Sequence, residues 1–309
     1  EERALAGGTI IKTDTSPDGV WGATVTANPA GGLDEVLVID LIAANTPVIT
    51  VSPATLSGFT YVTGSGPSAA QTYTLSAANL EGSGNIAVTA PADYEISSDG
   101  TAFSSSLSLP FAGGVITGQP LTISVRLKAG LAVGNYNGQQ IVHAGGNASN
   151  AIVTCSGSVT YPVPVLSAET LPMWIQGING TNAKRVPFAF RASISNMLPN
   201  ATYRYFNKVV ISSDSPTTDG AGNVIFVNAD GSFARTSSTS MANAGEYGEF
   251  TTDASGSYSG WFITEPSGNA RFTPGNQVFM RIMLNNGENG TSVATRLTTT
   301  ASAEVINFG

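Results

Sequence analysis

The chain has 309 residues, which suggests about two domains and enough length to bury hydrophobic cores. Charged residues make up only 11% of it, against about 25% in an average soluble protein. Hydrophobic residues reach 41%, which argues against disorder despite the 35 glycines. The net charge of −8 excludes a typical nucleic-acid-binding protein, because phosphates attract lysine and arginine.

Several further classes of protein are excluded by what the sequence contains only once or not at all. A membrane-spanning helix needs about 18 consecutive apolar residues, and the sequence contains no uninterrupted apolar run of that length. One cysteine, Cys155, cannot form an intrachain disulfide, and together with one histidine, His143, it cannot build the common Cys/His zinc sites. Most familiar catalytic machinery is therefore missing, and we expect no enzyme activity.

Alternation of apolar and polar residues predicts β-strands along most of the chain. The predicted strands, in chain order, are residues 73–76, 86–89, 121–127, 152–159, 189–194, 203–211, 222–227, 257–263 and 278–284. Clusters of Gly, Asn, Asp and Pro separate them and supply tight turns. No segment has a helical pattern. The sequence predicts an all-β fold of tandem antiparallel β-sandwich domains of the immunoglobulin-like type.

A short internal repeat predicts the domain boundaries. The ten residues from Pro47 match those from Pro162 without gaps at five positions, namely Pro, Val, Ser, Thr and Leu. Each copy would lead a stiff proline-containing linker into the first strand of a module. We therefore predict one sandwich in residues 47–161 and a second in residues 162–309.

Residues 1–46 are acidic and too few to form a core of their own. We expect them to be the end of a preceding module, a short extra sheet, or a segment whose run Ala4–Ile11 donates a strand to another molecule.

The region from Gly64 to Val159 resembles a known family. It contains Gly64-Ser65-Gly66-Pro67-Ser68, Ala90-Pro91-Ala92-Asp93-Tyr94-Glu95-Ile96-Ser97, Val125-Arg126-Leu127-Lys128-Ala129-Gly130-Leu131, Gly134-Asn135-Tyr136-Asn137-Gly138 and Cys155-Ser156-Gly157-Ser158-Val159. In order and spacing these motifs resemble the immunoglobulin-like repeat module of secreted multidomain proteins of the Bacteroidota. Residues 176–182, 203–207, 248–253 and 279–285 look like a β-domain that often follows that module.

The resemblance implies location and architecture more than activity. Such proteins are typically exported by the type IX system and lie at the cell surface or outside the cell. Some carry nuclease or phosphoesterase domains elsewhere in the chain. No catalytic motif is carried over from the family onto residues of this sequence.

One candidate base, His143, and one candidate nucleophile, Cys155, are better explained by structural roles. His143 would serve a Ser-His-Asp triad only beside a serine and a carboxylate, and no nucleophile elbow surrounds it. Cys155 lies in an alternating strand, where a thiol packs as a small hydrophobe. We expect both side chains to be structural.

A cluster of carboxylates and aromatic residues raises the alternative of a sugar site. Glycoside hydrolysis needs two acids, and an aromatic ring can serve as a platform for a sugar. The carboxylates are Glu246, Glu249, Asp253 and Glu265, and the aromatic residues are Tyr247, Tyr258 and Trp261. A carbohydrate-binding face is the more plausible of the two uses, although turns and cores also take these residues.

Calcium is the best-supported ligand in the sequence. The segment from Asp214 to Asn223, with Asp219 between them, places hard oxygen donors on a glycine-containing loop. Asp14 and Asp18 repeat the pattern more weakly. Neither segment has EF-hand spacing, and tight turns use the same residue types. Asp214, Asp219 and Asn223 are the candidate metal ligands, with no other cofactor expected.

These observations favour a noncatalytic structural or adhesive β-sandwich protein on the outside of a bacterial cell. Its partner would be a protein or a surface glycan, and self-association is an option. One alternative is a surface filament subunit that exchanges a strand through its N-terminal segment. Another is the noncatalytic accessory region of a secreted hydrolase or nuclease.

Overall fold

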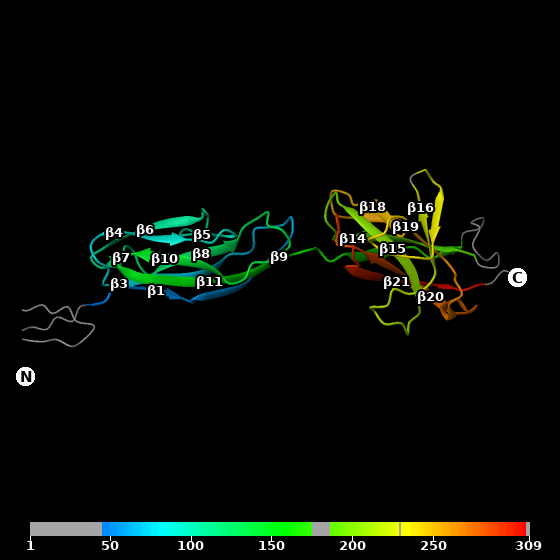
Figure 1. Cartoon of the computed structure of the whole chain (residues 1–309), viewed down its shortest axis with the longest axis horizontal. Helices are drawn as coiled ribbons and strands as arrows, with labels where there is room; N and C mark the ends of the chain where they lie inside the picture. The colour runs from blue at the N-terminus through cyan, green and yellow to red at the C-terminus, as the bar shows by residue number, and fades with distance from the viewer. Residues whose placement is uncertain (1–44, 175–185, 229, 307–309) are drawn as a thin grey trace, which may run out of the picture. The chain divides into compact units, whose positions relative to one another are not determined.

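The computed structural model describes residues 45–174, 186–228 and 230–306. Two compact units make up the chain, and each is described by itself. Figure 1 shows strands β1–β11 in the blue-to-green unit and the later strands in the green-to-red unit. The predictions for residues 1–44, including the donated strand and the acids Asp14 and Asp18, lie outside the described residues, as does the motif at residues 176–182.

The first sandwich contains eleven strands in two sheets. The strands are β1 (Val48–Ser52), β2 (Thr55–Val62), β3 (Gln71–Ala78), β4 (Gly84–Thr89), β5 (Tyr94–Ser97), β6 (Ser106–Ala112), β7 (Val115–Ile116), β8 (Leu121–Leu127), β9 (Gly134–Asn135), β10 (Gln139–Gly145) and β11 (Ala148–Thr160). Sheet A has the order β1-β3-β8-β5, and sheet B has the order β2-β11-β10-β4-β6-β7, with β9 paired to β11.

Side-chain alternation builds the core between sheets A and B. Along β3, Tyr73 and Leu75 are buried while their neighbours are exposed or half-buried. Contacts between aromatic rings join the two sheets, because Phe59 of β2 meets Tyr94 of β5 edge-on at 5.3 Å.

The second sandwich contains the remaining strands. They are β12 (Val165–Glu169), β13 (Met173–Trp174), β14 (Phe188–Ser195), β15 (Thr202–Val210), β16 (Asn223–Val227), β17 (Phe233–Thr236), β18 (Gly248–Thr251), β19 (Tyr258–Glu265), β20 (Gln277–Leu284) and β21 (Thr295–Glu304). Sheet C has the order β12-β14-β19-β16-β17, with β13 paired to β14, and sheet D has the order β18-β15-β20-β21. A single 3₁₀ turn, η1, covers Ala270–Phe272.

An aromatic core joins sheets C and D. Tyr205 of β15 meets Phe262 of β19 at 5.2 Å and Phe226 of β16 at 5.6 Å, both edge-on. The core also holds one amide, since Asn207 Nδ2 donates to the carbonyl oxygen of Ile263 at 2.9 Å. A buried polar group needs such a partner, and this bond ties the middle of sheet D to sheet C.

The predicted fold class is confirmed: the described residues form antiparallel β-sandwiches, with η1 as their one helical turn. All nine predicted strands coincide with observed ones. Both copies of the internal repeat lie at the edge of a sheet, as β1 in sheet A and β12 in sheet C. The exact boundaries at residues 46 and 161 stay a prediction. Within the described part of the chain, no helix is long and apolar enough to cross a bilayer.

Gly157 of β11 shows how tightly the first core closes. A methyl group at this position would overlap the carbonyl oxygen of Phe59 and lie 2.8 Å from the Cβ of Phe59 and 3.0 Å from Tyr94 Oη. Because both neighbours belong to the packed core, neither can move aside without cost.

We expect Gly157→Ala to lower the free energy of unfolding of the first sandwich by about 1–3 kcal/mol through overpacking. Chemical denaturation followed by tyrosine fluorescence and circular dichroism measures the loss. Gly134→Ala is the matched control, because a methyl group there meets nothing within 4 Å. Equal stability of the two variants would contradict the packing argument.

Candidate binding face and the predicted site residues

The face of sheet C that points away from the core carries a distinctive set of side chains. Core-facing residues of this sheet are Phe188, Phe190, Ala192, Ile194, Val224, Phe226 and Phe262. The residues between them therefore point outward. These outward residues, called the outer face of sheet C below, are Ala189, Arg191, Ser193, Asn223, Ile225, Val227, Phe233, Arg235, Ser259, Trp261, Ile263 and Glu265.

One part of the outer face is buried. Ala189, Ile263 and Ile225 lie side by side on three neighbouring strands and form a small apolar cluster of their own. Next to them, Glu265 is fully buried and pairs with Arg235 at 3.4 Å. Burial of this carboxylate requires such a cation, because an unmatched buried charge would cost several kcal/mol.

The neighbouring part of the outer face is open. Arg191 of β14 lies directly opposite Trp261 of β19, and both side chains are exposed, Trp261 by 38%. Two residues further along these strands, Ser193 lies opposite Ser259, and their hydroxyl groups hydrogen bond at 3.2 Å. The two strands thus present two successive rows: an indole opposite a guanidinium, and then a pair of hydroxyl groups.

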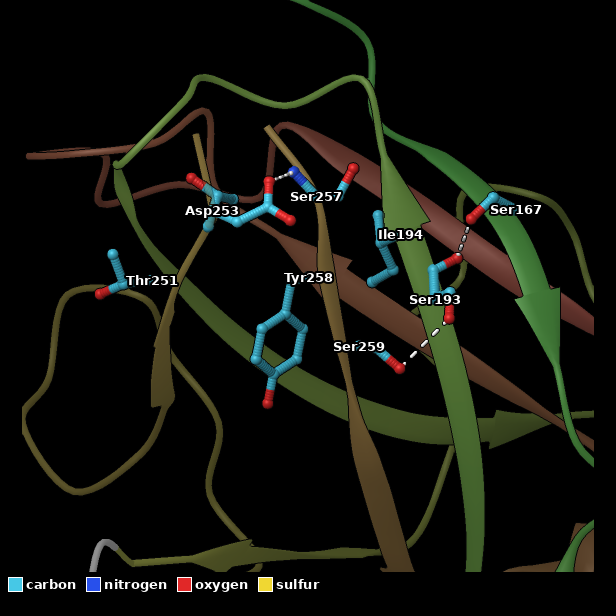
Figure 2. A pocket seen from close by; sticks show the side chains of 9 residues that line it. Ser167, Ser193, Ile194, Thr251, Asp253, Ser257, Tyr258 and Ser259 are labelled. Atoms are coloured by element: carbon cyan, nitrogen blue, oxygen red, sulfur yellow. Dashed lines mark hydrogen bonds between the residues drawn. The ribbon is translucent and has the colours of Figure 1, made fainter. Parts of the chain in front are cut away.

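A shallow groove of about 510 Å³ continues from the serine pair. Ser167, Ser193 and Ser259 lie along one side of it, and Asp253 and Ser257 lie along the other (Figure 2). The remaining lining residues are Ile194, Thr251, Thr252 and Tyr258. Hydroxyl groups therefore dominate the wall, with a single carboxylate among them.

Asp253 is held in a tight turn. Its Oδ1 accepts hydrogen bonds from the amides of Ser255 at 2.8 Å and Ser257 at 2.9 Å, and from Ser255 Oγ at 2.6 Å. The hydroxyl of Ser255, followed by these amides, lowers the pKa of Asp253 below its usual range. The groove therefore contains a negative charge at neutral pH.

The acids of the predicted carboxylate cluster each have a partner of their own. Glu249 pairs with Arg204 at 3.5 Å, Glu246 accepts from Asn243 at 3.2 Å, and Glu265 is buried against Arg235. The candidate aromatic platform also divides. Tyr258 stacks on Phe250 within the core at 3.9 Å, and Tyr247 lies beneath Arg204, whereas Trp261 is on the outer face of sheet C.

The predicted calcium ligands each have a different partner. Asp214 accepts from Arg271 through both carboxylate oxygens, at 2.6 and 2.8 Å. Asp219 accepts from Arg296 at 2.8 Å. Asn223 donates its amide to Glu265 at 3.1 Å. The hydrogen bond from Arg271 lowers the pKa of Asp214. Arginine side chains thus supply the positive charge that calcium was predicted to supply.

Arg281 completes this arrangement from the outward side of sheet D. Its Nη1 donates to the carbonyl oxygens of Ser215 at 2.7 Å and Thr218 at 2.5 Å, both within the predicted calcium loop. Among the described residues, no group of three or more His, Cys, Asp or Glu side chains could hold a metal ion. Calcium binding at Asp214, Asp219 and Asn223 stays a prediction.

His143 and Cys155 both lie in the first core. His143 is fully buried, with its Nε2 2.7 Å from Tyr73 Oη and its Nδ1 3.0 Å from the carbonyl oxygen of Ala151. These bonds suit a neutral ring that donates from Nδ1 and accepts at Nε2. Burial lowers the pKa of His143 and raises the pKa of the Cys155 thiol to about 12.

The pairing of Arg191 with Trp261 was not anticipated from the sequence. Trp261 was singled out together with acids near it in the chain, but its cross-strand neighbours come from β14. Alternation predicted that Arg191 and Ser193 share one side of a strand. The register between β14 and β19, however, is set by contacts distant in sequence.

No model of a known protein family matches the chain, and no curated protein matches it. Similar solved structures include a Bacteroides uniformis β-glucuronidase, with 12% identity and a TM-score of 0.25 over 77% of this chain and 27% of that one. A tetra-tandem repeat from the extending region of a large adhesion protein has 14% identity and a TM-score of 0.24, over 84% of this chain and 49% of that one.

A third similar structure is the IG1 and IG2 portion of DIP-gamma, with 10% identity, a TM-score of 0.20, and coverage of 86% of this chain and 100% of that one. The chain thus spans about a quarter of the glucuronidase and half of the adhesion-protein structure. Similarity at this level does not extend to activity, ligand or partner.

The first sandwich should lose stability in mild acid. Because burial lowers the pKa of His143, the unfolded chain takes up a proton first as the pH falls through about 6.5. The contribution of His143 to the free energy of unfolding is therefore fully present above that pH and decreases below it. Thermal unfolding between pH 7.5 and 5 measures the loss.

His143→Gln is the matched variant, since this is the chain's single histidine. It should be less stable at neutral pH, yet it should lose the part of the pH dependence that is centred near pH 6.5. An unchanged profile in the variant would contradict the assignment to His143.

Excess calcium should not raise the unfolding temperature of the second sandwich relative to EDTA. The expected reason is that arginine side chains already donate to Asp214, Asp219 and the carbonyl groups between them. Differential scanning calorimetry measures the shift. A calcium-dependent increase that Asp219→Asn abolishes would contradict this expectation and support the calcium site.

Proposed function

We propose that this chain is a noncatalytic structural or adhesive part of a protein on the outside of a bacterial cell. The observation that supports the proposal best is where the candidate catalytic groups lie. His143 and Cys155 are core residues, while Asp253 lies in a tight turn and Glu249 and Glu265 form ion pairs. None of these groups has the nucleophile–base geometry that acyl transfer requires.

Sandwiches with few charged residues suit a module that separates or presents other groups. Export by the type IX system of the Bacteroidota is part of this proposal and depends on the sequence resemblance alone. The chain's physical work would be to hold its exposed faces and sheet edges where a protein, a glycan or a second copy can meet them.

Protease added to intact cells that make the full-length protein should remove it. A surface protein is cleaved before lysis, and a cytoplasmic control protein in the same cells survives. Antibodies raised against residues 47–309 follow the loss on blots. Full protection of this protein until the cells are lysed would contradict the surface location.

Self-assembly into a filament through residues 1–46 is tested separately. Electron microscopy and light scattering compare the full chain with a chain that begins at residue 45. For a noncatalytic spacer or adhesive module, we expect both to be monomeric. Regular polymers that form only with the N-terminal segment would instead favour the filament subunit.

A further inference from the structure

We propose that the outer face of sheet C, together with the groove beside it, binds a chain of uncharged sugars. The site consists of Trp261, Arg191, the serine pair Ser193 and Ser259, and Asp253. This inference rests on the proposed function, because it names the partner of a surface module.

Trp261 supplies the platform. Its indole is 38% exposed, and its partner across the strands, Arg191, is exposed beside it. An aromatic ring presents a negative π face, which attracts the slightly positive C–H groups on the flat side of a sugar ring. A tryptophan side chain has only two torsion angles, so little side-chain entropy is lost on binding.

The groups of the proposed site match sugar hydroxyl groups in both directions. Arg191 only donates hydrogen bonds, the Asp253 carboxylate only accepts them, and the hydroxyl groups of Ser193 and Ser259 can do both. A sugar hydroxyl also donates and accepts. A protein surface that offered donors alone would suit a phosphate or a carboxylate better.

Balanced charge favours an uncharged ligand. Arg191 contributes one positive charge to the site and Asp253 one negative charge. Glu265 and Arg235, the other ionisable groups on the outer face of sheet C, neutralise each other. A polyanion would gain from Arg191 but would be repelled by Asp253, and the whole chain carries a net charge of −8.

The layout suits a chain of sugars rather than one. Successive rows on the same face of a strand are separated by about 7 Å, so the Trp261 row and the serine row are one such step apart. The groove of about 510 Å³ then begins at the serine row. Its hydroxyl-rich wall extends the possible contact beyond a single ring.

The test is electrophoresis of the full chain through gels that contain dextran, soluble starch, xylan, galactomannan or mixed-linkage β-glucan. Gels with polygalacturonate or heparin test the anionic alternative. At least one neutral polysaccharide should retard the wild-type chain more than either polyanion does. Retardation by a polyanion alone, or by none of the polymers, would overturn the proposal.

Variants then locate the site. Trp261→Thr should bind the retarding polysaccharide about tenfold more weakly, because it loses the aromatic contact. Arg191→Gln should weaken binding and Arg191→Lys should weaken it less. Val115→Thr changes an equally exposed apolar residue of the first sandwich and should bind like the wild type.

Circular dichroism and the unfolding temperature show whether each variant folds. If Trp261→Thr does not fold, Ser259→Ala, which removes one hydroxyl group of the serine row, replaces it and should also weaken binding. Wild-type affinity in a folded variant at residue 261 overturns the proposal. A surface-exposed protein that binds no neutral polysaccharide overturns only the sugar site, whereas protection from protease on intact cells overturns the proposed surface function.

Discussion

Every strand in this protein has two faces, and only one of them can enter the core between two sheets. In the first sandwich the consequences are simple. Outward positions along β3 and β8 carry mostly Thr and Ser, with Arg126 as the charged exception, and inward positions carry mostly Tyr, Leu, Ile and Val. In the second sandwich the outward faces of both sheets also bury side chains, and these include charged groups that need partners.

On the outward side of sheet D, burial involves cations. Lys208 and Arg281 lie directly opposite each other on β15 and β20, and both are nearly inaccessible to solvent. Burial lowers the pKa of each. Two like charges in such a pair repel unless acceptors surround them. Lys208 donates to the carbonyl of Gly222 at 2.8 Å, while Arg281 uses those of Ser215 and Thr218.

This explains why a loop rich in Asp, Ser and Gly follows β15. Its oxygen atoms surround the cations of sheet D, and its two acids accept from Arg271 and Arg296. Oxygen donors on a tight loop have the same local sequence whether they receive calcium or guanidinium groups. The arginines that donate to this loop lie 57 to 77 residues away in the chain, so local reasoning could not foresee them.

Throughout the molecule, features set by local sequence could be predicted, and features set by contacts between distant segments could not. Strands such as β8 and β20 could be predicted, because alternation is a local property and few charges interrupt it. The order of strands in each sheet could not be predicted, since it depends on contacts between distant segments. Trp261 shows the limit clearly: sequence placed it near Glu265 and Tyr258. In the fold, Glu265 is buried against Arg235, and Tyr258 stacks on Phe250 at the core.

The two outward faces of the second sandwich therefore differ in what they leave for a ligand. On sheet D, the loops that neutralise the cations also cover them, so the charged groups are already satisfied within the chain. On sheet C, the apolar cluster of Ala189, Ile225 and Ile263 is buried, but the next row on β14 and β19, Arg191 and Trp261, is exposed. One row further on, the hydroxyl groups of Ser193 and Ser259 hydrogen bond to each other, whereas the guanidinium of Arg191 and the indole of Trp261 are exposed to solvent. This open row is where the second sandwich can recognise a partner without giving up any interaction that stabilises its own fold.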